Sequence, residues 1–160
     1  MDTKLYDRQI RAFGADFNCK IQMLRICVVG EGILFEELSK QLVLLGINTI
    51  YTDCLKFKLH SRTKVLKVDQ INENTVDYVI SSKITNINIP HQHILVQPTS
   101  SGYSFKLSST ASEQQNIELT ASQMLMAANT FMFWFRDVIG GKTNGIQLNV
   151  FKYSVNLIKE

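Results

Sequence analysis

The stretch LRICVVGEGILFEELSKQLVLLGINTIYTD, residues 24–53, holds a strand, a helix and a second strand in succession. Residues 24–29 are mostly apolar and β-rich, which is typical of a buried strand. Gly30-Glu-Gly32 follows as a tight turn, and apolar residues then recur at helical spacing up to Gly46. Residues 48–52 are the second strand, which ends at Asp53. About thirty residues in this order predict a βαβ unit with parallel strands and a right-handed crossover.

The rest of the chain extends this unit into an α/β domain. Two short β-rich runs, 64–68 and 76–80, add strands to the sheet, and a turn at 98–102 joins two more, 93–97 and 103–107. A polar linker at 108–116 leads to an apolar helix that begins at residue 117 or 119 and ends at 139, before Gly140-Gly141. A last strand is predicted at 149–155, and one or two helical turns at 6–14. The fold class is therefore α/β, a Rossmann-like, mostly parallel sheet flanked by helices, with an N-terminal helical arm over 1–23 and a C-terminal extension of β-hairpin, helix and strand.

Composition narrows the class of protein. With 160 residues and 45% hydrophobic residues, one domain spanning 1–160 is expected. Apolar runs are too short to cross a membrane, and the first residues are too polar for a secretory signal, so we expect no membrane and an intracellular location. The net charge of +3 comes partly from basic residues between Lys56 and Lys67, which a solvated loop and edge strand explain; we expect no nucleic-acid partner.

The three cysteines, Cys19, Cys27 and Cys54, show neither metal-ligand nor redox spacing. We expect no zinc and no disulfide, and we interpret the three as buried structural thiols in a reducing compartment.

The turn Gly30-Glu-Gly32 stands where a dinucleotide or ATP fold places the phosphate-binding motif G-x-G-x-x-G. Asp53 follows the second strand, where an acidic residue can accept a ribose hydroxyl. Phe35 replaces the third glycine and would crowd the strand against the helix, while Glu31 brings a negative charge to the place of a phosphate. We therefore predict a degenerate site that holds no nucleotide; the alternative is a working nucleotide site that uses Gly30, Gly32 and Asp53.

A longer set of motifs carries a family resemblance. Tyr6-Asp-Arg-Gln-Ile-Arg11 with Gly14, then Arg25-Ile-Cys-Val-Val-Gly30, Leu42-Val-Leu-Leu-Gly46 and the strand ending at Asp53 resemble the opening of ThiF-like adenylation domains. These domains belong to the enzymes that activate ubiquitin-like modifiers. The first motif is most similar to smaller, non-catalytic subunits, those of SUMO activation above all. The match covers about the first third of the chain, and the later strands and the apolar helix are similar to the family's closing elements.

Departures from the family define what the resemblance implies. Catalytic members carry an acidic pair and an Asn-Leu-x-Arg-Gln segment after the second strand, whereas this chain has Cys54-Leu-Lys-Phe-Lys-Leu-His60, and it has no room for an inserted catalytic-cysteine domain. The resemblance thus implies a pseudoenzyme subunit with no cofactor of its own. ATP and magnesium would belong to a catalytic partner in a heterodimer, located in the nucleus, the cytoplasm or both.

Arg8 is the candidate catalytic residue. In the family, the arginine at this position of the first motif reaches across the dimer to the ATP phosphates in the partner's site, and Arg11 is a weaker candidate helper. A guanidinium suits this role because its charge is permanent and its planar fork can bind two phosphate oxygens. The alternative is that Arg8 is a surface ion-pairing residue of a docking arm. Two other functions stay open: a small homodimeric adenylating enzyme like the bacterial sulfur-carrier activators, and a non-catalytic nucleotide-binding regulatory domain.

Overall fold

The computed structural model describes residues 11–55, 63–71, 76–83, 91–107, 119–141, 145–149 and 154–157. The described elements are the helices α2 (Ala15–Ile21), α3 (Ile33–Leu45) and α4 (Ala121–Ile139), the 3-10 helix η1 (Val68–Gln70), and the strands β1 (Arg25–Val29), β2 (Thr49–Thr52), β3 (Lys64–Leu66), β4 (Tyr78–Ser81), β5 (Gln92–Thr99), β6 (Gly102–Leu107), β7 (Gly145–Asn149) and β8 (Ser154–Leu157).

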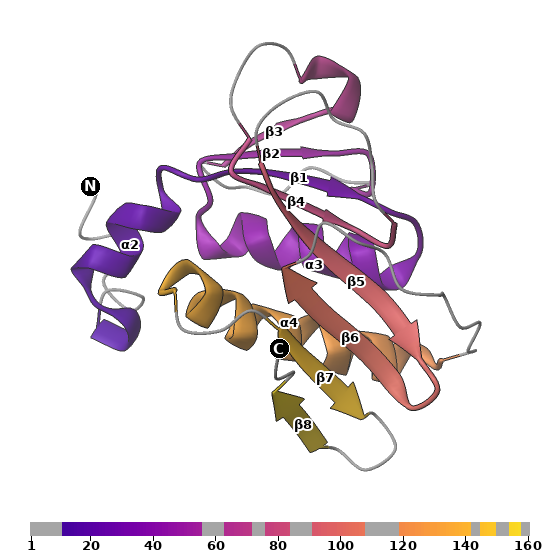
Figure 1. The fold of residues 1–160 in the computed structure, drawn as a ribbon. Coiled ribbons are helices and arrows are strands. Elements are labelled where there is room, and N and C mark those ends of the chain that lie inside the picture. The colour runs from indigo at the N-terminus through magenta and orange to yellow at the C-terminus, as the bar shows by residue number, and fades with distance from the viewer. Residues whose placement is uncertain are drawn as a thin grey trace.

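One sheet runs through the molecule in the order β3-β2-β1-β4-β5-β6-β7-β8 (Figure 1). The first five strands are parallel, and β6, β7 and β8 continue the sheet in antiparallel pairs. The chain leaves β1 for β2 and β3 on one side, then returns to β4 and β5 on the other. The strand order thus reverses beside β1, and in open α/β sheets such a reversal leaves a crevice at the carboxyl ends of the strands.

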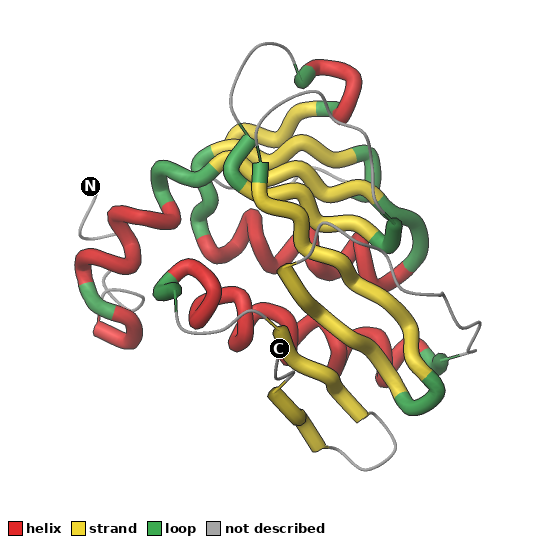
Figure 2. The backbone as a smooth tube through the Cα atoms, in the orientation of Figure 1, coloured by secondary structure: helices red, strands yellow, loops and turns green. Residues whose placement is uncertain are grey.

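The two long helices cover the same face of this sheet and pack against each other (Figure 2). Successive side chains of a strand point to opposite faces of the sheet, and Ile26, Val28, Ile80 and Ile94 point to this face and are fully buried. Phe131 of α4 packs edge-on against Phe105 of β6, with ring centroids 5.4 Å apart. The aromatic content of α4 thus serves the core, although Leu125 and Phe133 of the same helix are exposed.

The opposite face carries a smaller apolar cluster. Cys27, Tyr51, Val76 and Val79 are buried there, and η1 packs against them through Val68. Each of the two faces therefore has its own apolar cluster in the described part of the chain.

The predicted fold class is confirmed, and so are the βαβ unit and the hairpin. The structure corrects the predicted ends of some elements and one predicted strand. Pro98 and Gly102 lie inside β5 and β6, so the hairpin turn is tighter than predicted. The single strand predicted at 149–155 is wrong: β7 and β8 form an antiparallel pair in which Asn149 faces Ser154. The signal missed was the alternation in residues 145–149, where Ile146 and Leu148 are buried.

The N-terminal region differs from the expectation in a second way. Residues 11–13 are helical and end at Gly14 as predicted, but Gly14, with φ 86°, precedes a further helix, α2, which was not predicted within the arm. This helix anchors to the core through Ile21, which is fully buried, and Phe17, which is half-buried. Residues 1–10, with most of the helix predicted at 6–14, lie outside the described residues, as does the linker predicted at 108–116.

Candidate functional site

The turn between β1 and α3 has the backbone of a glycine motif. Gly32 immediately precedes α3 and has φ 85° and ψ −179°, a conformation that only glycine adopts readily. Gly32 has no side chain that could cap α3, and the first backbone N–H groups of this helix lie at the turn. In a nucleotide-binding fold, a phosphate would accept from such groups.

Phe35 occupies the space over this turn. A Cβ atom added to Gly30 would lie 2.5 Å from three atoms of the Phe35 ring, far inside van der Waals contact. The ring itself is buried in the main core. The crowding predicted from the sequence is therefore real, and it is accommodated because residue 30 has no side chain. Where the motif would have a third glycine, the ring of Phe35 fills the space between β1 and α3.

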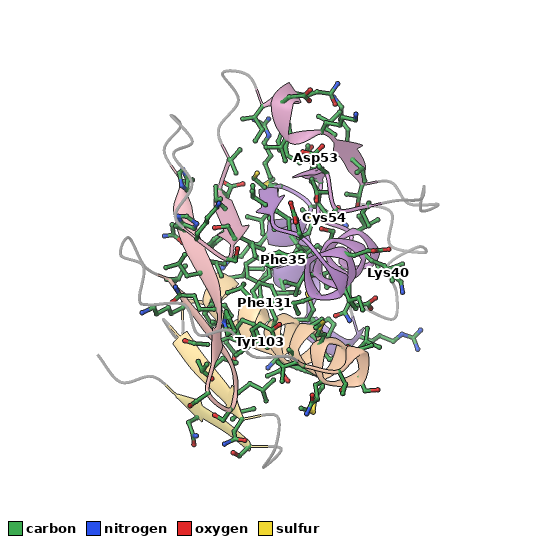
Figure 3. All side chains as sticks on the ribbon, turned by 90° about the vertical axis from the view of Figure 1, so that its right-hand side faces the viewer. Phe35, Lys40, Asp53, Cys54, Tyr103 and Phe131 are labelled. Atoms are coloured by element: carbon green, nitrogen blue, oxygen red, sulfur yellow. The ribbon has the colours of Figure 1, made fainter. Side chains whose placement is uncertain are left out.

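A cavity of about 830 Å³ nevertheless lies at the carboxyl ends of the parallel strands. We call it the carboxyl-edge cavity. Its lining comes from β1, the turn after it, the start of α3, the ends of β2 and β4, η1 and the β5–β6 hairpin. Figure 3 looks onto this edge, with Asp53 and Cys54 near the top, Phe35 below them and Tyr103 lower still. The lining residues are Val28, Val29, Gly30, Glu31, Phe35, Asp53, Cys54, Val68, Ser82, Lys83, Val96, Pro98 and Tyr103.

The end of β2 is tied to the turn by a thiol. Cys54 is half-buried, and its Sγ donates to the carbonyl oxygen of Gly30 at 3.1 Å, while its backbone N–H donates to Thr52 Oγ1 at 3.1 Å. Thr52 Oγ1 is in turn 3.2 Å from Ser39 Oγ of α3 in the core. These bonds fix the edge that carries Asp53, whose exposed side chain lines the cavity.

The end of β4 is held by a second network. Ser81 Oγ donates to the backbone carbonyl of Lys83, so it accepts the hydrogen bond from His93 Nε2, which is 2.6 Å away. This arrangement requires a proton on Nε2, which both the neutral Nε2–H tautomer and the doubly protonated ring carry. Burial, together with the neighbouring His91, lowers the pKa of His93, which favours that neutral form. The network thereby positions the backbone that carries Ser82 and Lys83 into the cavity.

Charges at the cavity oppose a nucleotide. Glu31 and Asp53 bring two carboxylates and Lys83 one ammonium to the described lining, an excess of one negative charge. Glu31 stands at the turn itself, where a phosphate would have to approach the start of α3. Glu31 beside the turn disfavours a phosphate there, and Phe35 crowds the turn from its core side, between β1 and α3.

The structure places Gly30, Phe35 and Asp53 around one cavity, and Gly32 lies in the same turn, directly before α3. Ser82 and Lys83 were missed, although the rule that carboxyl ends of parallel strands share one edge would have found them. Tyr103 was also missed, because it reaches the cavity from the antiparallel hairpin and has no local sequence signal.

Arg8 lies outside the described residues, and Arg11 is exposed in the short helical segment before Gly14. The cysteine interpretation needs correction: Cys27 is buried as expected, but Cys54 is half-buried at the cavity and Cys19 is exposed. Cys19 is exposed because it lies on the outer side of α2, whose buried residues are Asn18 and Ile21. Among the described residues no group of three potential ligands is placed to hold a metal ion, and no described helix is long and apolar enough to span a membrane.

Comparison with known proteins gives one relative by sequence. Over 128 residues the chain is 29% identical to the NEDD8-activating enzyme E1 regulatory subunit of Caenorhabditis elegans. The match covers 78% of this chain but 22% of that protein, so the chain spans about a fifth of its relative's length. No model of a known protein family matches the chain.

Solved structures share the fold. The PaaA structure superposes with a TM-score of 0.62 at 12% identity, covering 99% of this chain and 73% of the other. A structure of Escherichia coli MccB gives a TM-score of 0.65 at 11% identity, covering 96% of this chain and 69% of the other. The chain therefore has the Rossmann-type fold of ThiF-like and MccB-like proteins, together with a weak sequence relationship to a regulatory subunit of a modifier-activating enzyme.

Proposed function

We propose that this chain is the accessory subunit of a heterodimeric activating enzyme for a ubiquitin-like modifier. A catalytic partner binds ATP and magnesium and adenylates the modifier. This chain supplies an interface and the arginine Arg8, which stabilises the charge that develops on the phosphates in the partner's site. The regulatory-subunit relative and the ThiF-like fold support this assignment.

One observation carries the proposal: the Phe35 ring is packed on Gly30 at the turn where this fold would hold phosphate. In this proposal, a subunit that retains the fold but whose turn is crowded by Phe35 serves adenylation through another subunit's nucleotide. The negative charge of Glu31 at the same turn acts in the same direction.

The first test is to identify the proteins that co-purify with this chain. The tagged full chain should co-purify with a larger protein that carries an intact G-x-G-x-x-G motif and a catalytic cysteine. The chain alone should not retain labelled ATP, whereas the complex should. Tight ATP binding by the chain alone would reject an accessory role.

Arg8→Ala tests the trans-acting arginine. In the purified complex we expect assembly to persist and adenylate formation, measured by ATP–pyrophosphate exchange, to fall about ten- to a thousandfold, the range for one charge-stabilising contact. Lys4→Ala is the matched control, because it removes a positive charge from the same arm. Arg11→Ala should have a smaller effect than Arg8→Ala. Unchanged exchange in the Arg8→Ala complex would discard the role.

The modifier is a finer part of the proposal. The opening motif favours SUMO, whereas the sequence relative is named for NEDD8. Offering the purified complex SUMO, NEDD8 and ubiquitin separately, and measuring which one drives pyrophosphate exchange, decides between them.

A second candidate function rests on the carboxyl-edge cavity. Its volume of about 830 Å³ and the position of Asp53 favour a regulatory domain that binds a nucleotide without catalysis. A homodimeric adenylating enzyme is the third possibility, and it needs a phosphate site in this chain. Equilibrium dialysis of the chain with ATP and NAD separates both from the accessory role.

A further inference from the structure

Two of the chain's three histidines lie side by side at the start of β5. His91 directly precedes the strand, His93 is its second residue, and the centroids of their rings are 5.7 Å apart. Residues two apart in an extended chain point to the same face of a sheet. Since His93 pairs with Val79 of the smaller apolar cluster, the two rings lie on the face opposite α3 and α4. Both side chains are partly exposed, so a small ion can reach them.

The hydroxyl of Ser81 orients one of these rings. Ser81 Oγ donates to the carbonyl oxygen of Lys83 and accepts from His93 Nε2, which lies 2.6 Å away. In the neutral ring this places the proton on Nε2 and a lone pair on Nδ1. Histidines that bind metals are commonly held in this way, with one ring nitrogen bonded to a neighbouring group and the other to the metal. The same holds for His91, since one nitrogen can keep another partner while the second binds a metal.

The spacing of the two rings suits one shared metal ion. Metal–nitrogen bonds of about 2.0–2.1 Å place the centres of two imidazoles on one ion about 4.5–6 Å apart, depending on the angle between the bonds. The observed 5.7 Å falls within that range. Because the pairing of β5 with β4 keeps this backbone extended, the folded chain presents the two rings as a preformed pair.

We propose that His91 and His93 form a binding site for a divalent first-row transition metal ion, with Ser81 as the residue that positions His93. Imidazole suits Cu²⁺, Ni²⁺ and Zn²⁺, and the general order of affinity makes Cu²⁺ the tightest of the three. No third histidine, cysteine or carboxylate among the described residues joins the pair, so water takes the remaining coordination positions. Neither histidine lines the carboxyl-edge cavity, so this site is independent of the function proposed above.

Titration calorimetry of the untagged full chain with Ni²⁺ and Zn²⁺ tests the site. We expect a single metal ion per chain, and we expect His91→Ala and His93→Ala each to raise the dissociation constant about tenfold or more, because the second imidazole of a pair binds at high effective concentration. His60→Ala is the matched control, since it removes the remaining histidine of the chain and should leave the dissociation constant unchanged. A background with Cys19→Ser and Cys54→Ser removes the two cysteines that are not fully buried as competing ligands.

The positioning role of Ser81 has its own test. Ser81→Ala should weaken Ni²⁺ binding about ten- to a hundredfold, the range for a group that orients a metal ligand. Ser81→Thr keeps the hydroxyl and should restore binding. Urea denaturation of both variants separates a loss of binding from a loss of folding. Ser81→Ala binding as tightly as the wild-type chain, or a folded Ser81→Thr that binds no better than Ser81→Ala, would discard this role.

Electron paramagnetic resonance of bound Cu²⁺ decides the proposal without altering the site. In the His60→Ala chain the only histidines left are His91 and His93, so the spectrum should show nitrogen hyperfine coupling from two imidazoles. In His91→Ala with His60→Ala it should show one. Coupling from a single imidazole when both histidines are present, equal dissociation constants for the wild-type chain and His91→Ala, or an equal loss of affinity in His60→Ala and His91→Ala would each overturn the proposal.

Discussion

Gly30 and Phe35 form a packing pair in which the large residue requires the small one. An added methyl group at Gly30 would lie 2.5 Å from the Phe35 ring, which is buried and cannot move away without repacking the core. We therefore expect Gly30→Ala to lower the free energy of unfolding by about 1–3 kcal/mol, as overpacking does. Urea denaturation of the purified chain measures this loss.

The Phe35→Ala background identifies the cause. Phe35→Ala alone should cost about 3–5 kcal/mol, and Gly30→Ala added to it should cost almost nothing further, because the ring is gone. Gly32→Ala is the control: its cost of about 1–3 kcal/mol comes from φ 85° and should be the same in both backgrounds. If the losses of unfolding free energy from Gly30→Ala and Phe35→Ala were additive, the cost of Gly30→Ala would not come from contact with the Phe35 ring.

The Cys27 thiol gives a pH-dependent prediction. Burial, with smaller contributions from Asp53 and Cys54, raises the pKa of Cys27 from 9.0 to about 12. Below pH 9 the thiol is protonated in both the folded and the unfolded chain and has no effect. Above pH 9 the unfolded chain loses this proton and the folded chain retains it, so stability falls as pH rises toward 12, by at most about 1.4 kcal/mol per pH unit.

Comparison with Cys27→Ala isolates this effect from other groups. Burial also raises the pKa values of Tyr78 and Tyr103, which titrate in both proteins and cancel in the difference. The stability advantage of the wild-type chain over Cys27→Ala should shrink between pH 9 and pH 10.5 in guanidinium denaturation. A difference that stays constant over this range contradicts the assigned pKa.

The positions of single residues could be predicted where they depend on spacing along the backbone. The motif spacing alone placed Gly30, Gly32 and Asp53 at one edge, and the size of Phe35 predicted its crowding of the turn. Exposure was harder, because it depends on which side of an element meets the core. Cys19 is exposed for that reason. Cys27 has the same side chain, yet it is buried in the sheet.

At the scale of the element, α4 has a specific start signal. Thr120 Oγ1 accepts from the Gln123 backbone N–H at 3.3 Å, and Gln123 Oε1 accepts from the Thr120 backbone N–H at 3.0 Å, which is a capping box. Thr120→Ala should lower the free energy of unfolding by about 1 kcal/mol. Ser122→Ala, at an exposed position in the same turn, should change it by less than about 0.5 kcal/mol. Equal losses in thermal denaturation would show that the box does not stabilise the helix.

The same box explains why the predicted start of this helix was imprecise. Apolar spacing extends back to Leu119, so periodicity placed the start at 117 or 119, whereas Thr-x-x-Gln places it at residue 121. The end of α3 at Gly46 needed no such correction. The alternation in residues 145–149 could have located β7. The register of the two short C-terminal strands could not be predicted, because it is set by pairing of β7 with β6 and of β8 with β7, and pairing with β6 is a long-range contact that local patterns do not contain.

At the scale of the whole molecule, the predicted βαβ unit indicated a parallel sheet. It could not indicate the order of the strands in that sheet. The sequence offers β-rich runs but does not say that β4 adds beside β1, the step that reverses the winding and creates the crevice at the carboxyl edge. The cavity was therefore unforeseen, although several of its residues had been named. Phe35 crowds the turn from the core side, in the contact between β1 and α3, and so leaves the cavity beyond the strand ends open.

The sheet order also predicts where stability resides. Strands β1, β4 and β5 lie inside the sheet and carry fully buried residues such as Ile26, Ile80 and Ile94, whereas β3 and β8 lie at its two ends. Amides in the central strands should exchange with solvent by global unfolding, with protection of about 10⁴ or more, while those of β3 and β8 should open locally, with protection about 10² or less. Hydrogen exchange followed by mass spectrometry checks this at peptide resolution. Equal protection of β3 and β1 would mean that the edge and the centre of the sheet unfold as one unit.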